Sequence, residues 1–145
     1  MADLKTTLSK TFALESEIKA LLSAAAFDGY DELCRLPIDE TDSDQLFLRD
    51  ELQAIMMKLL EVKDRIAYLK RPVKETSRLH KNRQGRYETA SGYVYTSGDA
   101  IEALIDNGYY DAPYWVRTSV EHNGKDYYLV KCQNTCMNGL PVRRR

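Results

Sequence analysis

The side chains best suited to acid–base or metal chemistry are two histidines and two cysteines in the second half of the chain. His80 and His122 have no catalytic motif around them, since the chain contains no G-x-S-x-G, P-loop or H-E-x-x-H sequence. Cys132 and Cys136 are separated by three residues, and with both histidines they could form a tetrahedral zinc site. Because C-x-x-x-C is less typical of zinc sites than C-x-x-C, we predict two ordinary thiols, no metal and no cofactor.

Acidic residues are concentrated in the segment 28–44, DGYDELCRLPIDETDSD. Its paired carboxylates, such as Asp39-Glu40 and Asp42-Asp44, fall in a predicted connector, where they would cap a helix or keep the loop solvated. Neither pair has the surroundings of a general acid and base, so we predict that the protein is not an enzyme. An exposed acidic run could also mimic the phosphates of a nucleic acid, and that alternative stays open.

Basic residues and aromatic rings dominate the second half. Residues 70–86 contain seven bases and one acid, and the chain ends in three arginines. Lysine and arginine bind phosphates, and tyrosine rings stack on bases, so we predict a surface that binds nucleic acid or a protein partner. The alternative is a solvated basic surface over an aromatic core. The candidate binding residues are Arg83, Arg86, Tyr93, Tyr95, Trp115, Arg117, Arg143, Arg144 and Arg145.

The near-zero net charge of −1 hides two halves of opposite sign. Residues 1–69 carry 14 acids and 8 bases, whereas residues 70–145 carry 8 acids and 13 bases. The second half also holds eight of the ten tyrosines and the single tryptophan. We therefore predict two domains, a helical region over residues 1–72 and a small β-rich domain over residues 73–145.

The second part of the helical region has the heptad pattern of a coiled coil. From Leu48 to Leu69, apolar residues follow steps of four and three, which predicts a helix over about residues 44–71 that ends before Pro72. Met56 and Leu60 widen this stripe, so a second partner could also be covered. We predict a homodimer through the helical region. The predicted dimer residues are Leu52, Ile55, Leu59, Val62 and Ile66.

A first helix is predicted over about residues 3–27, with Leu4, Leu8, Ile18, Leu22 and Ala25 on one face. Two arrangements are open. This helix could fold back antiparallel onto the heptad stripe of the second, or the second could pair with its own copy while the first packs outside.

After Pro72 the pattern changes to short strands and turns. We predict strands at residues 78–81, 86–89, 93–95 and 140–143, and a helix at residues 100–105 that ends at Asn107-Gly108. The strongest local signal is a hairpin of residues 115–121 and 126–130 around Asn123-Gly124. The predicted fold class is therefore α+β: a long helical hairpin or coiled coil, then a curved five-stranded sheet or open barrel with one helix.

Residues 78–143 carry the segments GRYE, YVYTSGDAIEALI, YWVRTSVEHNGKDYYLV and NGLPVR in that order. This order resembles a short uncharacterised domain of anaerobic Gram-positive bacteria and their mobile elements. The resemblance implies a small non-enzymatic domain in a mobile-element setting. It implies no reaction, and it does not extend to the helical half.

These features predict a non-catalytic interaction protein that binds a macromolecule. No stretch of about 18 apolar residues suggests a membrane span, and the cysteine pattern favours the cytoplasm. The setting that the resemblance implies suggests a narrower form, an inhibitor of a host nuclease defence complex similar to an anti-CRISPR protein. The alternative is an accessory protein that binds DNA or RNA through the basic, tyrosine-rich β domain.

Overall fold

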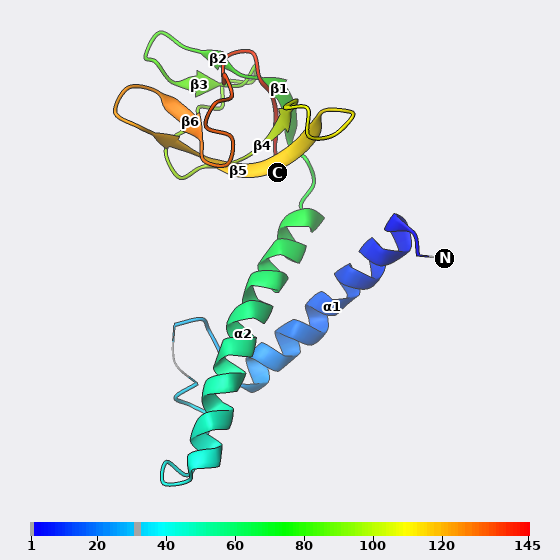
Figure 1. Ribbon diagram of the computed structural model, residues 1–145, viewed down its shortest axis with the longest axis vertical. Helices are drawn as coiled ribbons and strands as arrows, with labels where there is room; N and C mark the ends of the chain where they lie inside the picture. The colour runs from blue at the N-terminus through cyan, green and yellow to red at the C-terminus, as the bar shows by residue number, and fades with distance from the viewer. Residues whose placement is uncertain (1, 31–32) are drawn as a thin grey trace. The chain divides into compact units, whose positions relative to one another are not determined.

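A computed structural model describes residues 2–30 and 33–145 of the chain, which divides into two compact units, Met1–Arg71 and Pro72–Arg145. The first unit contains helices α1 and α2, and the second contains strands β1 to β7 (Figure 1). The predicted α+β class is confirmed. Neither helix is long and apolar enough to cross a lipid bilayer, within the described part of the chain.

Helix α1 (Leu4–Ala24) and helix α2 (Ser43–Lys70) form close to the predicted ranges because the sequence supplies their caps. The carboxylate of Asp3 accepts a hydrogen bond from the Thr6 backbone N–H, and that of Asp42 accepts bonds from Asp44 and Gln45. Such side-chain acceptors satisfy N–H groups that have no partner within a helix. The predicted acidic connector, residues 28–44, includes Asp31 and Glu32, which lie outside the described residues.

The core of the helical unit uses only part of the predicted heptad stripe, namely Ile66 and, partly buried, Leu59. Its centre is formed by Ile18, Leu22, Phe27, Leu33, Met56 and Ile66. Helix α1 covers the Met56 and Leu60 side of α2, which is the side that widens the stripe. Coiled-coil pairing within the chain is therefore not seen.

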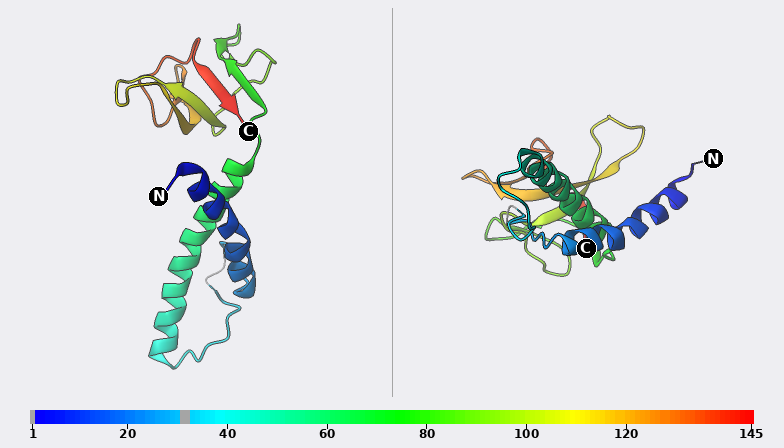
Figure 2. Two further views of the ribbon diagram at one scale, coloured as in Figure 1. Left: turned by 90° about the vertical axis from the view of Figure 1, so that its right-hand side faces the viewer. Right: turned by 90° about the horizontal axis from the view of Figure 1, so that it is seen from below.

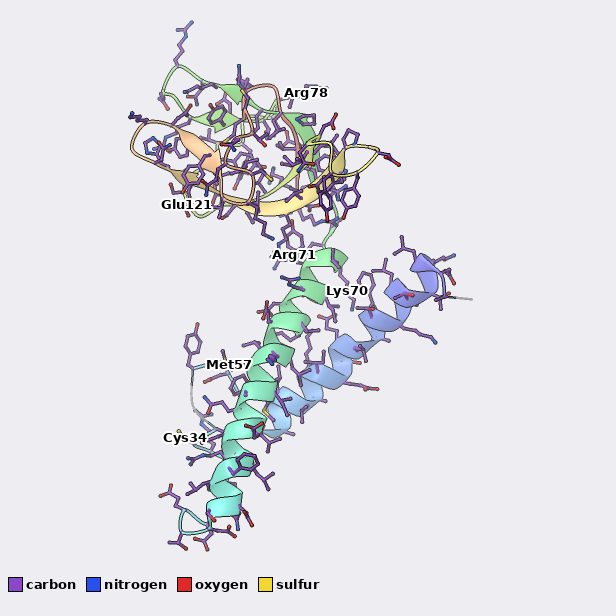
Figure 3. All side chains as sticks on the ribbon, viewed as in Figure 1. Cys34, Met57, Lys70, Arg71, Arg78 and Glu121 are labelled. Atoms are coloured by element: carbon purple, nitrogen blue, oxygen red, sulfur yellow. The ribbon has the colours of Figure 1, made fainter. Side chains whose placement is uncertain are left out.

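The N-terminal end of α1 extends beyond the C-terminal end of α2, its predicted partner. Lys70, the last residue of α2 and labelled in Figure 3, forms an ion pair with Glu15 of α1. Phe12 of α1 also packs against the core and lies under the Lys70 ammonium group, whereas Leu4 and Leu8, further toward the N-terminus, stay exposed although they continue the apolar face. Figure 1 shows the two helices separating toward this end.

The second unit is built around a five-stranded antiparallel sheet with the order β1-β7-β4-β5-β6. Its strands are β1 (Glu75–Arg78), β4 (Ala100–Ile105), β5 (Tyr114–His122), β6 (Tyr127–Leu129) and β7 (Pro141–Arg144). The last strand lies beside the first (Figure 2), so the two ends of the unit are joined within the sheet. Strands β2 (His80–Lys81) and β3 (Tyr87–Glu88) form a separate two-stranded sheet. The arrangement is not a closed barrel.

One side of the five-stranded sheet faces the core. Ile101, Ala103, Val120, Leu129 and Val142 are almost completely buried on it. They pack with residues from β3 and the loops, namely Leu79, Tyr87, Tyr95, Met137 and Leu140. Because side chains alternate along a strand, the residues between these lie on the opposite, outer face.

The predicted helix at residues 100–105 is wrong, since this segment is strand β4. Alanine, leucine and glutamate favour a helix locally, but β4 pairs with β5 on one side and β7 on the other. Alternation then buries Ile101, Ala103 and Ile105 together, so tertiary pairing overrides local propensity. The carboxylate of Asp99 accepts the Thr96 N–H in a turn before the strand and caps no helix.

The other strand predictions are confirmed in part. The hairpin forms, but with a four-residue loop in which Asn123 accepts hydrogen bonds from the N–H groups of Lys125 and Asp126. The predicted strand 78–81 is divided between β1 and β2 at the buried Leu79. The predicted strand 93–95 is reduced to a single bridge between Glu88 and Val94.

Candidate binding face of the five-stranded sheet

The predicted binding residues separate into three places in the C-terminal unit. Trp115, Arg117, Arg143 and Arg145 belong to the outer face of the five-stranded sheet, by strand alternation and by the contacts described below. Arg144, Tyr93 and Tyr95 lie together on the core side of that sheet. Arg83 and Arg86 are exposed in and beside the turn between β2 and β3.

The outer-face group is organised by Glu102, which sequence reasoning did not single out. In the sheet register, Glu102 of β4 is opposite Arg143 of β7 on one side and Arg117 of β5 on the other. Three charged residues of neighbouring strands therefore form one row across the sheet. We call Trp115, Arg117, Arg143 and Arg145, with Glu102 among them, the arginine face.

The carboxylate of Glu102 holds two arginine side chains. Its Oε1 accepts a hydrogen bond from Nε of Arg143 at 2.7 Å, and its Oε2 accepts one from Nε of Arg145 at 2.6 Å. Glu102 is only 4% exposed, so these bonds occur largely away from water. Charge-assisted bonds to a buried carboxylate are strong and fix the guanidinium groups in place.

The Arg143 guanidinium also stacks on an aromatic ring. Its Cζ lies 4.3 Å from the ring centre of Trp115, within the usual range for a cation–π contact. One arginine of the face is thus fixed by both a carboxylate and a ring. Two arginines against one carboxylate leave this cluster with a net positive charge, and the exposed Arg117 adds to it.

A cluster of tyrosines lies in the loop between β4 and β5, which leads into the strand that carries Trp115 and Arg117. Tyr109 and Tyr110 are 75% and 58% exposed, and their rings meet edge-on at 4.8 Å. Tyr110 meets Tyr114 in the same way, and Asn107 donates a side-chain hydrogen bond to the Tyr114 hydroxyl. The loop joins β5 at Tyr114, which is opposite the buried Ile105 and so lies on the core side of the sheet, whereas the next residue, Trp115, lies on the arginine face.

Arg144 supports the core side of the sheet instead of the arginine face. Its Nε donates to Oε2 of Glu75 at 3.2 Å, and its guanidinium lies 4.4 Å from the ring centre of Tyr93. Desolvation alone would raise the pKa of Glu75, but the hydrogen bonds from Ser91, Thr89 and Arg144 outweigh it, so the pKa is lowered. The contacts of Arg144 therefore stabilise the unit and do not belong to the arginine face.

Tyr95 is part of the core and is 1% exposed. Its hydroxyl is buried without a hydrogen-bond partner among the described residues. This burial raises the pKa of Tyr95 far above its ordinary value. Tyr95 cannot contact a ligand from this position, whereas Tyr93 remains partly exposed at its edge.

The residues considered for zinc have other partners. Nε2 of His80 is 2.6 Å from Oε1 of Glu88, and Nδ1 of His122 accepts the N–H of Gly124. Sγ of Cys136 lies 3.8 Å from the carbonyl oxygen of Asn138, and Cys132 packs at the edge of the core. Across residues 2–30 and 33–145, no three histidine, cysteine or acidic side chains group together in a way that could hold a metal.

Sequence reasoning missed Glu102 because a helix was predicted there. In a strand, Glu102 lies between Ile101 and Ala103, and because Ala103 points into the core, Glu102 points to the outer face. Arginines of the two neighbouring strands are then opposite it in the sheet. Tyr109 and Tyr110 were missed because Asn107-Gly108 was interpreted as the end of a helix. The same residues begin the hairpin loop that exposes the rings.

A comparison with known protein families finds an uncharacterised domain in the same part of the chain as the resemblance described above. Residues 76–144 match the family model of a domain of unknown function, DUF5348. The match falls within the C-terminal unit and includes every strand except the first residue of β1. The bacterial source and the mobile-element setting stay predictions. Comparisons with curated proteins and with solved structures give no match.

Proposed function

We propose that the protein is a non-catalytic binding protein whose C-terminal unit binds single-stranded nucleic acid through the arginine face. The observation that carries this proposal is the pair of arginines held by the buried carboxylate of Glu102 on one side of the sheet. Arginines fixed in this way lose little side-chain entropy when a phosphate binds. The proposal concerns the class of ligand and not its sequence.

Arg143 illustrates how the face can receive a phosphate. A guanidinium has five N–H donors, and the bond from Nε to Glu102 uses one of them. Stacking on Trp115 holds the guanidinium plane without using a donor. The remaining donors of a fixed guanidinium suit the oxygen atoms of a phosphate, which arginine binds in bidentate geometry.

The exposed tyrosines favour a single strand over a duplex. Rings that project from a loop can stack on unpaired bases, whereas the bases of a duplex already stack on each other. Each base that stacks on an aromatic side chain contributes about 1–3 kcal/mol to binding. Tyr109 and Tyr110 have the exposure that such stacking needs.

The test is a binding titration with fluorescently labelled single-stranded DNA and RNA of about 15 nucleotides, followed by anisotropy. We expect saturable binding in about 50 mM salt that weakens steeply by about 200 mM. Arg117→Gln should weaken binding several-fold. Arg83→Gln removes the same charge from the turn between β2 and β3 and should leave binding unchanged. The proposal would be overturned if neither DNA nor RNA bound, or if Arg117→Gln and Arg83→Gln lost the same amount of affinity.

The narrower hypothesis of a nuclease inhibitor is tested by none of these findings and stays a prediction. Its phosphate-mimic version relies on the acidic connector, where two carboxylates have local roles. Asp42 caps α2, and Asp39 accepts hydrogen bonds from the N–H and hydroxyl of Thr41. These bonds lower the pKa of both residues. Neutralising them would therefore alter the connector as well as its charge.

A further inference from the structure

The helical unit leaves an apolar stripe exposed along α2. Leu48, Ile55, Val62 and Leu69 are seven residues apart, and 56%, 49%, 41% and 48% of their surfaces are exposed. Leu52 continues the stripe and is 38% exposed. At 1.5 Å per residue the stripe is about 30 Å long. Contiguous apolar surface of this extent is unusual on a monomer and marks an interaction site.

Helix α1 does not compete for this stripe. It covers the side of α2 that carries Met56 and Leu60, and it buries Ile66 to 2% exposure. Ile66, predicted as a dimer residue, is therefore used inside the chain, and Leu59 is partly used there. Of the predicted dimer residues, Leu52, Ile55 and Val62 therefore remain available for a contact with another chain.

We propose that this stripe binds the same stripe of a second copy of the chain, with the two α2 helices antiparallel. The four heptad-spaced residues are symmetric about the point between Lys58 and Leu59. An antiparallel pair therefore places Leu48 opposite Leu69 of the copy, and Ile55 opposite Val62 of the copy. Every stripe residue is then covered by another stripe residue around a two-fold axis.

Charge along α2 selects a second copy and its direction. In this register the halves of the stripe that face each other, residues 48–58 and 59–69, each contain two acids and two bases. The direction of the pair is therefore decided by the individual charges that flank the stripe and not by the net charge of each half. The helix dipoles also oppose each other favourably in the antiparallel pair.

Two exposed residues that flank the stripe carry opposite charges. Glu51 lies beside the first half of the stripe and Arg65 beside the second half, both at the heptad position next to it. In the antiparallel pair, Glu51 of each copy comes near Arg65 of the other. Lys58 meets its own copy near the axis, where its long side chain can turn toward water.

The first test is the mass of the full chain by light scattering after gel filtration at tens of micromolar. The proposal predicts twice the chain mass of 16.7 kDa. Val62→Glu should give the single-chain mass with unchanged helical circular dichroism, because Val62 is outside the core of the unit. Met57→Glu is the matched control, since Met57 is 47% exposed on a different face of α2 (Figure 3). A monomeric wild type, or a dimer that survives Val62→Glu, would overturn the proposal.

The second test measures direction. In a chain with Cys34, Cys132 and Cys136 replaced by serine, Ile55→Cys and Val62→Cys variants are mixed and oxidised. An antiparallel pair gives a disulfide-linked dimer in the mixture and little in either variant alone. Cross-linking of each variant with itself would show a parallel pair and overturn the proposed arrangement. Neither test depends on nucleic-acid binding.

Discussion

Glu102 and Arg143 are direct partners across the β4–β7 pair, and their side chains are joined by a hydrogen bond of 2.7 Å from Nε to Oε1. The bond links the last strand of the sheet to its middle strand. Since Glu102 also holds Arg145, one buried carboxylate stabilises the sheet and fixes the arginine face at the same time. Stability and ligand binding in this unit therefore share a residue.

Glu102→Gln should destabilise the C-terminal unit. The amide keeps the shape of the side chain but removes the charge between two arginines, and breaking a largely buried ion pair costs about 3 kcal/mol. Urea unfolding followed by the fluorescence of Trp115 measures this loss. Asp111→Asn, in the exposed loop between β4 and β5, is the control and should change little. A loss below about 0.5 kcal/mol in Glu102→Gln, the size of an ordinary surface change, would mean that the pair adds nothing to stability.

Tyr95→Phe should leave stability unchanged or raise it. The hydroxyl of Tyr95 is buried without a described partner, so its removal relieves desolvation and breaks no hydrogen bond. Tyr95→Ala should cost about 3–5 kcal/mol, because it leaves a cavity in the core. Thermal and urea unfolding of both variants provide the comparison. A clear loss in Tyr95→Phe would show that the hydroxyl has a partner after all.

Acid should destabilise the C-terminal unit partly through Glu75. Its pKa is lowered in the folded chain from an ordinary value of 4.5, so its contribution is complete well above 4.5 and is lost as the pH falls through the lowered folded value. Protonation weakens the bonds from Arg144 and Ser91. Unfolding free energies measured from pH 6 downward should fall for the wild type and fall less for Glu75→Gln. Parallel curves for the two proteins would exclude this contribution.

Gly29→Ala should destabilise the helical unit more than a positive φ alone explains. Gly29 has a φ of 91°, and an added Cβ would lie 2.9 Å from Cδ2 of Leu60. Gly108 has a φ of 73° but open space around it, so Gly108→Ala measures the cost of the backbone conformation, about 1–2 kcal/mol. Urea unfolding by circular dichroism compares the two variants. Equal losses would mean that the connector moves aside without cost.

The helices could be predicted from sequence because their signals are local. Caps at Asp3 and Asp42, apolar periodicity and Pro72 define α1 and α2 without reference to any other element. The sequence pattern does not determine which side of α2 is covered by α1. It depends on which of two adjoining apolar faces packs better, and the heptad stripe alone cannot decide that.

The sheet was only partly predictable because its pairing is not local. The β5–β6 hairpin follows from turn residues close in sequence, whereas β4 is held by β7, about 40 residues further along. Without that pairing, residues 100–105 have the composition of a helix. The role of Glu102 could not be predicted for the same reason, because its arginine partners are brought near it only by the pairing of β4 with β5 and β7.

The candidate site was predicted by residue type but not by grouping. Arginines and aromatic residues were recognised as binding groups, yet strand alternation sends Arg144 to the core side and Arg143 and Arg145 to the outer face. Tyr95 shows the opposite error, since an aromatic suited to stacking is also suited to a core. Composition cannot separate these two uses.

The central claim is that nucleic acid binds on the arginine face, and Trp115 tests it most directly. It is the only tryptophan of the chain and lies under the Arg143 guanidinium, so its fluorescence reports on this face alone. Titration with unlabelled single-stranded DNA or RNA should change Trp115 emission saturably, at the same concentrations at which anisotropy detects binding. Binding by anisotropy with unchanged Trp115 emission would place the ligand elsewhere and contradict the claim.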